Sequence, residues 1–306
     1  MKTFKIHNTL GNKLEEFHPI DPKNVRVYAC GPTVYSYAHI GNARMAVVND
    51  LLIRFLRKIY PKVTYVSNIT DIDDKIIAAS EKTNTPFKEL TEKYTKIYND
   101  DMNILGVNLP DFQPKATEHI KDMILIISKL INNNFAYEKD GHVLFHVPSF
   151  KKYGSLSGRN RDEQILGSRV EVAPYKKDPT DFVLWKPSSD LMPGWESPWG
   201  FGRPGWHLEC SAMSEKTLGL PFDIHSGGVD LVFPHHENEI AQTCALHNNT
   251  EDIKKFSKYW FHNGFVNIEG EKMSKSLGNI FYIRDFLDEQ PGEVLRLALL
   301  SGHYRQ

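Results

Sequence analysis

The sequence is poor in cysteine and has no long apolar segment. Its three cysteines, Cys30, Cys210 and Cys244, are too few for a disulfide framework. The longest unbroken apolar run is Met123–Ile127, far shorter than the roughly 20 residues that a membrane span needs. The first residues, Met1–His7, alternate in polarity and lack the apolar region of a signal peptide. These absences predict a reduced, cytoplasmic protein without a membrane segment.

No charge of one sign predominates in the chain. Lysine and arginine total 37 and aspartate and glutamate 38, which gives a formal net charge of −1. This balance excludes a uniformly basic nucleic-acid coat protein but not a local basic patch. Hydrophobic residues make up 41% and charged residues 25% of the 306 positions. We therefore expect a packed globular core, with one large domain or two smaller ones.

Strand and helix patterns alternate, which favours an α/β fold with a parallel sheet. A strand is predicted at Arg26–Cys30, and Gly31-Pro32 breaks it. Apolar residues at helical spacing predict a long helix from about Ala43, and Val63–Ile69 is typical of a second strand. Strand, turn, helix and strand in this order form a βαβ unit, and such units build parallel sheets.

The chain divides by composition into four stretches, 1–115, 116–204, 205–262 and 263–306. In the second we expect a helix around Glu118–Ile131, a strand at His142–Val147 and then a loop-rich run dense in Pro, Gly and Trp. This stretch is interpreted as an insertion that leaves the sheet and returns. In the third stretch we expect a helix at about His207–Thr217, a strand at Phe222–His225 and a helix starting near Pro234. From about Trp260 we expect a further strand and a Lys/Ser/Gly loop, and then closing helices that include Glu293–Leu300.

A metal site is indicated around His235 and Glu239. These residues lie four apart on the helix predicted near Pro234, so their side chains share a face and could bind one ion. His236, three residues from Glu239, would also share that face, so spacing alone does not choose between the histidines. An exposed, charged helix start is the simpler alternative for a lone His/Glu pair.

The cysteines strengthen the metal hypothesis. Cys30 ends a predicted strand, where open α/β sheets bind ligands, and Cys210 lies at the start of a predicted helix. Two thiolates, one imidazole and one carboxylate would form a four-ligand zinc shell. Cys244 falls in a helical run with Ile240 and Ala245 and is expected to be buried packing.

Three segments are suited to nucleotide binding. The turn from Gly31 to Asn42 joins a strand to the long helix, whose N-terminus could bind phosphate through free N–H groups. Gly41 permits close approach of a ligand, while His39 and Asn42 can donate hydrogen bonds. The other two segments are a cationic loop with Lys272 and Lys275, and the strand end Gly227-Gly228 followed by Asp230. Each segment alone is also compatible with an ordinary surface turn.

His39-Ile40-Gly41-Asn42 and Lys272–Ser276 resemble, in order and spacing, the two signature motifs of class I aminoacyl-tRNA synthetases. Four further segments are similar to the cysteinyl-tRNA synthetases of that class: Cys30–Tyr35, Asn68–Lys75, Gly202–Met213 and His225–Glu239. The resemblance implies a Rossmann-like catalytic domain in two halves, 1–115 and 205–262, interrupted by a connective insertion at 116–204. It implies a mostly helical stem-contact segment at 263–306, and a chain without the anticodon-binding domain.

The resemblance also assigns residues to roles. Zinc would be bound by Cys30, Cys210, His235 and Glu239, with His236 a neighbour. The resemblance implies catalytic roles for His39, Asn42, Lys272 and Lys275. It implies that ATP is bound by Gly41, Gly228, Val266 and Lys275. Cysteine or its adenylate would be bound by Gly31, Thr33, Thr70, Trp206 and Asp230. Many class I enzymes carry a second histidine where this chain has Asn42, and an amide cannot be cationic.

The implied reaction activates L-cysteine with ATP and Mg²⁺ and transfers it to the 3′ end of tRNA(Cys). Zinc would select the thiolate of cysteine over the hydroxyl of serine. The enzyme is expected to be a monomer and to charge tRNA weakly without the anticodon-binding domain. A cysteine ligase of mycothiol synthesis, a non-catalytic paralogue that binds tRNA or nucleotide, and a purely structural zinc protein are the alternatives.

Overall fold

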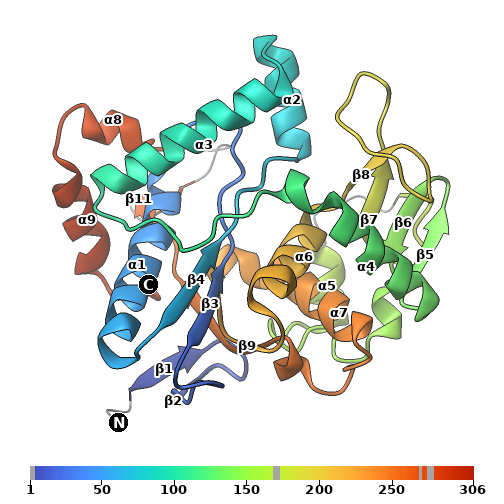
Figure 1. Ribbon diagram of the computed structural model, residues 1–306, viewed down its shortest axis with the longest axis horizontal. Coiled ribbons are helices and arrows are strands. Elements are labelled where there is room, and N and C mark those ends of the chain that lie inside the picture. Colours follow the sequence, from blue (N-terminus) through green and yellow to red (C-terminus); the bar gives the residue numbers. More distant parts are fainter. Residues whose placement is uncertain (1–3, 168–172, 269–270, 274–278) are drawn as a thin grey trace.

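The structure, a computed structural model, describes residues 4–167, 173–268, 271–273 and 279–306. Its main sheet has four parallel strands in the order β10-β9-β3-β4 (Figure 1). These are β3 (Val25–Ala29), β4 (Val63–Ser67), β9 (Phe222–Gly228) and β10 (Ser257–Asn263). The α/β fold with a parallel sheet is therefore confirmed, and the observed strands overlap the four that the sequence predicts.

Helices cover the main sheet on both faces, so most residues of its strands are buried whichever face they point to. On one face α1 (Ile40–Ile59) packs Val48, Leu52 and Leu56 against β3, β4 and β9. On the other face lie α6 (Trp206–Leu218) and α7 (Glu237–Leu246), together with α4 (Ile120–Asn132). Six of the seven residues of β9 are buried as a result.

The order of the strands places a ligand-binding crevice between β3 and β9. From β3 the chain passes through α1 to β4 on one side, whereas β9 pairs with β3 on the other side. Open α/β sheets bind ligands outside the carboxyl ends of the strands where the strand order reverses in this way. Cys30 directly follows β3, and Gly228 ends β9, so both lie at this point.

Several elements have no counterpart among the predictions. The N-terminal residues form a hairpin of β1 (Lys5–Asn8) and β2 (Lys13–Glu16). Two further helices, α2 (Asp74–Thr83) and α3 (Phe87–Ile104), follow β4. Both are rich in charged residues, and only two residues of α2 and five of α3 are buried.

The strands of residues 116–204 form a sheet of their own. It is antiparallel in the order β5-β6-β7-β8 and lies apart from the main sheet (Figure 1). The strands are β5 (Ala136–Lys139), β6 (His142–Phe145), β7 (Phe182–Pro187) and β8 (Gly202–Pro204), and α5 spans Arg161–Gly167. The sequence predicted a loop-rich run after the strand at His142–Val147 and did not predict β7 and β8, in which Phe182, Leu184 and Trp185 are buried.

The start of α7 differs from the prediction. The helix begins at Glu237 and not near Pro234. Before it lies a π-helical turn, Val232–His236, in which Phe233 has non-helical backbone angles and the Phe233–Pro234 peptide is cis. His235 and His236 therefore stand on the turn that leads into the helix, while Glu239 stands in its first turn.

The last helix of the described residues packs against α1. After β10 come the antiparallel pair β11 (Asn267–Ile268) and β12 (Glu271–Lys272), then α8 (Ile283–Leu287) and that last helix, α9 (Gly292–Ser301). The buried Arg44 guanidinium donates to the carbonyl oxygens of Leu299, His303 and Gln306. Short helical turns complete the described elements at Ala116–His119, Val147–Ser149, Val229–Leu231 and Ile253–Lys255.

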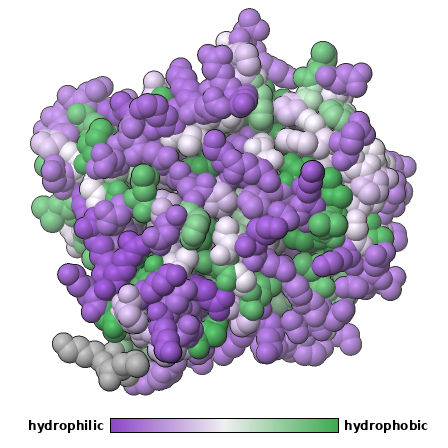
Figure 2. Space-filling view, viewed as in Figure 1, coloured by the Kyte–Doolittle hydropathy of each residue, from purple (hydrophilic) through white to green (hydrophobic). Residues whose placement is uncertain are grey.

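The surface is mainly polar. Figure 2 shows hydrophilic side chains over most of one face, with apolar side chains in small separate groups. Within the described ranges, no helix is both long enough and apolar enough to cross a membrane.

Asp50 joins three elements through one buried carboxylate. It accepts hydrogen bonds from Arg54 in α1, Arg296 in α9 and the backbone N–H of Asn108. We expect Asp50→Ala to lower the free energy of unfolding by about 2 kcal/mol, because it leaves Arg296 Nη2 and the Asn108 N–H without their acceptor. Chemical denaturation measures the change. Asp100→Ala, which removes an exposed i,i+4 pair with Lys96, should cost less than about 0.5 kcal/mol, and equal losses would contradict the assignment.

Candidate active site

A pocket of about 320 Å³ opens at the carboxyl ends of β3 and β9. Its wall is formed by the turn after β3, the start of α1, the segment after β9 and the residues after β10. Nine residues proposed from the sequence line it: Gly31, Thr33, His39, Gly41, Asn42, Trp206, Gly228, Asp230 and Val266. Segments that are distant in the sequence thus meet in one cavity, as the ligand-binding interpretation requires.

Thr70 lies behind this wall. Its backbone N–H donates to the carbonyl of Pro32 at 3.0 Å, and its carbonyl accepts from Val34 at 3.2 Å. Its buried hydroxyl donates to Glu209 Oε2 at 2.8 Å. Thr70 therefore fixes the turn that carries Thr33 and is not among the residues that line the pocket.

Gly31 is required by a close backbone approach. A Cβ atom at this position would lie 1.6 Å from the carbonyl oxygen of Asn68, so no larger residue fits without a shift of the backbone. The Asn68 side chain also accepts a hydrogen bond from the Gly31 N–H at 2.8 Å. These contacts hold the turn after β3 against the segment that follows β4.

The helix N-terminus beside the pocket differs from the expected phosphate site. His39 Nδ1 accepts from the backbone N–H groups of Gly41 and Asn42, and the Asn42 side chain accepts from His39 N–H. This reciprocal cap lets α1 start at Ile40, three residues before the prediction. The N–H groups of Gly41 and Asn42 are therefore already engaged, so His39 and Asn42 order the helix start as well as facing the pocket.

Of the two lysines in the cationic loop, Lys272 lies within the described residues and Lys275 does not. Lys272 is described through its backbone, as the second residue of β12. Lys275 lies outside the described residues. Val266, just before β11, lines the pocket, and its carbonyl accepts from the N–H of Met273 at 3.5 Å.

Sequence reasoning missed the aromatic part of the pocket. Five tyrosines line it: Tyr35, Tyr37, Tyr94, Tyr98 and Tyr282. Tyr37 meets Tyr94 edge-on at 5.5 Å between ring centroids, and Lys75 lies 5.9 Å from the ring of Tyr35. Two of these tyrosines belong to the Gly31–Asn42 turn and could have been noted there. Tyr94 and Tyr98 come from α3, for which the sequence predicted no helix.

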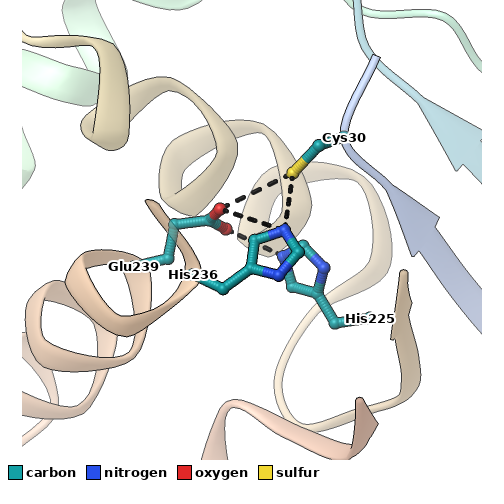
Figure 3. Close-up of side chains that lie close together, drawn as sticks. All are labelled: Cys30, His225, His236 and Glu239. Atoms are coloured by element: carbon teal, nitrogen blue, oxygen red, sulfur yellow. Dashed lines mark hydrogen bonds and ion pairs between the residues drawn. The ribbon is translucent and has the colours of Figure 1, made fainter. Parts of the chain in front are cut away.

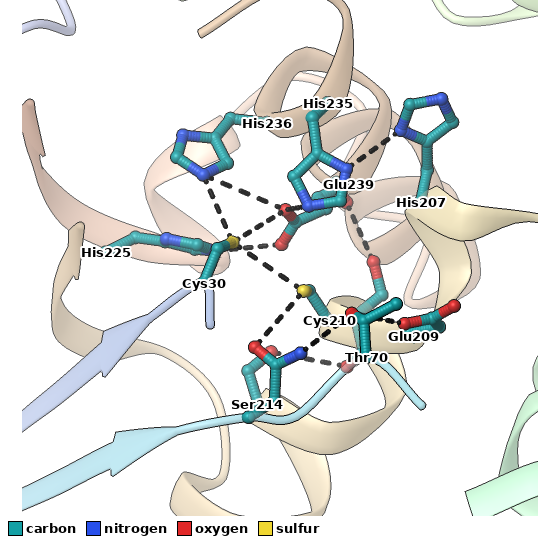
Figure 4. Close-up of polar contacts among 12 residues, drawn as sticks. Cys30, Thr70, His207, Glu209, Cys210, Ser214, His225, His235, His236 and Glu239 are labelled. Atoms are coloured by element: carbon teal, nitrogen blue, oxygen red, sulfur yellow. Dashed lines mark hydrogen bonds and ion pairs between the residues drawn. The ribbon is translucent and has the colours of Figure 1, made fainter. Parts of the chain in front are cut away.

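Next to the pocket, a buried cluster brings together the proposed metal ligands. Cys30, Cys210, His235 and Glu239 place one donor atom each within 4.8 Å of the others (Figure 4). The two sulfur atoms are 3.6 Å apart, and His235 Nε2 lies 3.0 Å from Glu239 Oε1. Trp206, which lines the pocket, stacks on the ring of His235 at 4.2 Å.

The donor atoms suit zinc. Tetrahedral zinc with bonds of about 2.0–2.3 Å separates its ligand atoms by roughly 3.3–3.8 Å, close to the sulfur–sulfur distance of 3.6 Å. Two sulfurs, an imidazole nitrogen and a carboxylate oxygen form a donor set that zinc accepts. Cys244 is buried elsewhere in α7, as expected, with its Sγ 4.0 Å from the carbonyl oxygen of Ile253.

Two more histidines, His225 and His236, reach the same cluster. His236 Nε2 is 3.3 Å from Cys30 Sγ, and His225 Nε2 is 2.8 Å from Glu239 Oε2 (Figure 3). The resemblance gave His236 the place of a neighbour and included His225 in the similar segment His225–Glu239, but it assigned His225 no role. Because both contact proposed ligands directly, they belong to the description of this centre.

Burial and mutual contacts set the protonation of the cluster. Although burial opposes it, hydrogen bonding from Cys30 lowers the pKa of Cys210 to about 6. Burial and the neighbouring Cys210 raise the pKa of Cys30 well above its usual value. Against the effect of burial, Glu239 raises the pKa of His235 to about 10, while His225 and His235 lower the pKa of Glu239 to about 2. Near neutral pH the protons therefore reside on Cys30 and His235.

The family model described as tRNA synthetases class I (C) catalytic domain matches residues 16–306. The chain belongs to this family. Cysteine–tRNA ligases of Rhodospirillum rubrum and Parvibaculum lavamentivorans are 59% and 58% identical to it over 99% and 98% of its length. The chain spans 65% and 64% of those two relatives.

Solved structures agree with the class I synthetase fold. A Mycobacterium tuberculosis methionyl-tRNA synthetase in complex with methionyl-adenylate has a TM-score of 0.68 at 16% identity, covering 91% of this chain and 64% of that one. A putative arginyl-tRNA synthetase from Campylobacter jejuni has a TM-score of 0.59 at 14% identity, over 92% and 64%. At these identities the likeness concerns the fold, and it confirms the Rossmann-like catalytic domain expected for a class I (C) synthetase.

The protonation of the cluster predicts how zinc binding depends on pH. Zinc needs Cys30 as a thiolate and His235 as a neutral imidazole, and both carry a proton between pH 7 and 8.5. We expect binding to release about two protons, so the apparent affinity rises about 100-fold per pH unit in this window. Calorimetry in buffers of different ionisation enthalpy counts the protons. Release of none, or an affinity independent of pH, would contradict the protonation pattern.

Proposed function

We propose that the chain activates L-cysteine with ATP to cysteinyl-adenylate, and that the adenylate then charges the 3′ end of tRNA(Cys). The observation that carries this proposal is the position of the buried thiol–imidazole–carboxylate cluster beside a pocket built from the first signature motif. Trp206 connects the two, since it lines the pocket and stacks on His235. The identity of 59% to a cysteine–tRNA ligase over nearly the whole chain supports the same reaction.

In the first step, a carboxylate oxygen of cysteine attacks the α-phosphorus of ATP. A new oxygen–phosphorus bond forms, the bond to the bridging oxygen breaks, and pyrophosphate leaves with that electron pair. The reaction requires no side chain as nucleophile, so the protein contributes position and electrostatic stabilisation. His39 and Asn42 would contact phosphate oxygens at the start of α1, and Lys272 and Lys275 would neutralise charge on the triphosphate, which Mg²⁺ accompanies.

The remaining pocket residues would hold the nucleotide and the amino acid. Gly41, Gly228 and Val266 offer backbone surface for ATP, where close approach matters more than side-chain chemistry. Asp230 is exposed in the wall and could accept hydrogen bonds from a ribose hydroxyl or from the amino group of cysteine. Gly31, Thr33 and Trp206 line the part of the pocket that would take the amino acid, with Thr70 supporting the turn from behind.

Zinc bound by Cys30, Cys210, His235 and Glu239 would favour a soft thiolate over a hydroxyl, which an apolar pocket could not separate strongly. The four residues are buried, and Trp206, which lines the pocket, stacks on His235. Selection would therefore take place at the wall of the pocket that Trp206 forms. All three cysteines are free, which fits a reducing, cytoplasmic location. In the second step, a ribose hydroxyl of tRNA would attack the carbonyl carbon of the adenylate, and AMP would leave.

Replacement of Lys275 tests the proposed role of the second signature motif. We expect Lys275→Ala to slow cysteine-dependent ATP–pyrophosphate exchange by about 100-fold or more, because charge developing on the phosphates loses a counter-ion. Lys88→Ala removes a lysine whose side chain is 86% exposed on α3 and should leave exchange unchanged. An undiminished rate in Lys275→Ala would show that this lysine has no part in activation.

Removal of the metal tests selection. After chelation and removal of zinc, we expect the ratio of kcat/KM for cysteine to that for serine, measured by pyrophosphate exchange, to fall by at least about 100-fold. Restoring stoichiometric zinc should restore the ratio. A metal-free protein that keeps its full preference for cysteine would refute the role of the cluster in selection.

A further inference from the structure

The buried cluster contains two overlapping sets of metal donors. The first donor set consists of Cys30, Cys210, His235 and Glu239, and the second donor set consists of Cys30, Glu239, His225 and His236. In each set the four donor atoms lie within 4.8 Å of one another, and all the residues involved are buried. Because both sets use Cys30 and Glu239, the two positions overlap.

The second donor set has suitable geometry in its own right. Cys30 Sγ is 3.3 Å from His236 Nε2 and 3.6 Å from Glu239 Oε1. His225 Nε2 lies 2.8 Å from Glu239 Oε2, and His236 Nε2 lies 4.0 Å from Glu239 Oε1. These separations bracket the roughly 3.3–3.8 Å between ligand atoms around tetrahedral zinc. The four side chains point toward one another in Figure 3.

Contacts behind the second donor set hold its histidines in place. His236 Nδ1 is 2.8 Å from His262 Nε2, and His262 Nδ1 is 2.7 Å from Thr9 Oγ1. When His236 donates through Nδ1, its Nε2 lone pair faces Cys30, as metal binding requires. His225 stacks on Trp260 with ring centroids 4.6 Å apart.

Different contacts hold the histidine of the first donor set. His235 Nδ1 is 3.0 Å from His207 Nδ1, and its ring lies against Trp206. In Figure 4, His207 and His235 stand on one side of the cluster and His225 on the other. Loss of Cys210 leaves the contacts that orient His225 and His236 in place, and loss of His235 removes only its tilted ring contact with His236, at 5.6 Å between ring centroids.

We propose that the second donor set is an alternative position for the same divalent ion, which occupies it when Cys210 or His235 is lost or cannot bind. This inference rests on the proposed zinc site and extends it from one position to two. With one thiolate, two imidazoles and one carboxylate, the alternative position is poorer in sulfur and suits Zn²⁺ or Co²⁺. It allows the buried centre to keep its ion, and the charge balance around Glu239, after damage to a ligand.

His235→Ala distinguishes the two positions by the atoms bound to zinc. An ion that stays with the remaining first-set ligands would have two sulfur and no imidazole neighbours, whereas an ion in the second donor set would have one sulfur and two imidazoles. We expect zinc K-edge absorption spectra of His235→Ala to show the second pattern, with about one zinc retained per chain. Cys210→Ser should give the same pattern, so the test does not depend on a single variant being folded.

Affinity measurements with competing chelators complete the test. Adding His225→Ala and His236→Ala to His235→Ala should weaken zinc binding by at least about 100-fold relative to His235→Ala alone. Cys244→Ser removes a buried thiol outside both donor sets and should keep the two-sulfur spectrum and the affinity of the unaltered chain. Far-ultraviolet circular dichroism reports folding for each variant.

The outcomes separate this inference from the proposed function. If both His235→Ala and Cys210→Ser lose zinc, or keep it without gaining a second imidazole neighbour, the alternative position is refuted while zinc in the first donor set stands. If the unaltered chain binds no zinc, the proposed metal site fails as well. Retention of zinc with one sulfur and two imidazoles in either variant supports the alternative position.

Discussion

The parallel pairing of β3 with β9 is the constraint on which the site depends. The Cys30 N–H donates to the carbonyl of Ser226 at 3.2 Å, so the first residue after β3 is aligned with the end of β9. This register places Cys30 beside the strand that carries His225 and ends in Gly227-Gly228. Since β3 is buried on both faces, it cannot slide without exposing apolar side chains, and the hydrophobic core therefore fixes the metal cluster and the pocket together.

Glu239 presents the main electrostatic problem of the cluster, because a buried carboxylate is costly unless it is paired. Two histidines pair with this carboxylate: His225 Nε2 lies 2.8 Å from its Oε2, and His235 Nε2 lies 3.0 Å from its Oε1. Burial and neighbouring histidines hold the pKa of His236 well below its usual value, so that ring stays neutral. The cluster thus balances a carboxylate and the Cys210 thiolate against few positive charges, and a divalent cation would complete this balance.

The sequence predicted much of this site because its motifs lie at strand ends and helix starts. Cys30, Gly31, His39, Trp206 and Asp230 were all proposed, and the fold brings them to one place. The sequence could not separate His235 from His236, since residues three and four positions before Glu239 share a helical face, and the π-helical turn removed that regular geometry. His225 received no role from the sequence, although it begins a segment of the resemblance, because a lone histidine in a buried strand is usually packing. The helices α2 and α3 were missed because few of their residues are buried.

In the proposed reaction, selection of the thiol and formation of the adenylate would be coupled through the same rigid elements. Trp206 begins α6, whose next turn carries Cys210, and its ring touches both the pocket and His235. His39, which also lines the pocket, caps α1, which packs on the other face of β3. In the proposed reaction, an amino acid bound between Trp206 and His39 would therefore be positioned by two helices that pack on one sheet. A side chain that fails to reach the metal cluster would leave its carboxylate misplaced relative to His39, so discrimination at the thiol would also reduce the rate of adenylate formation.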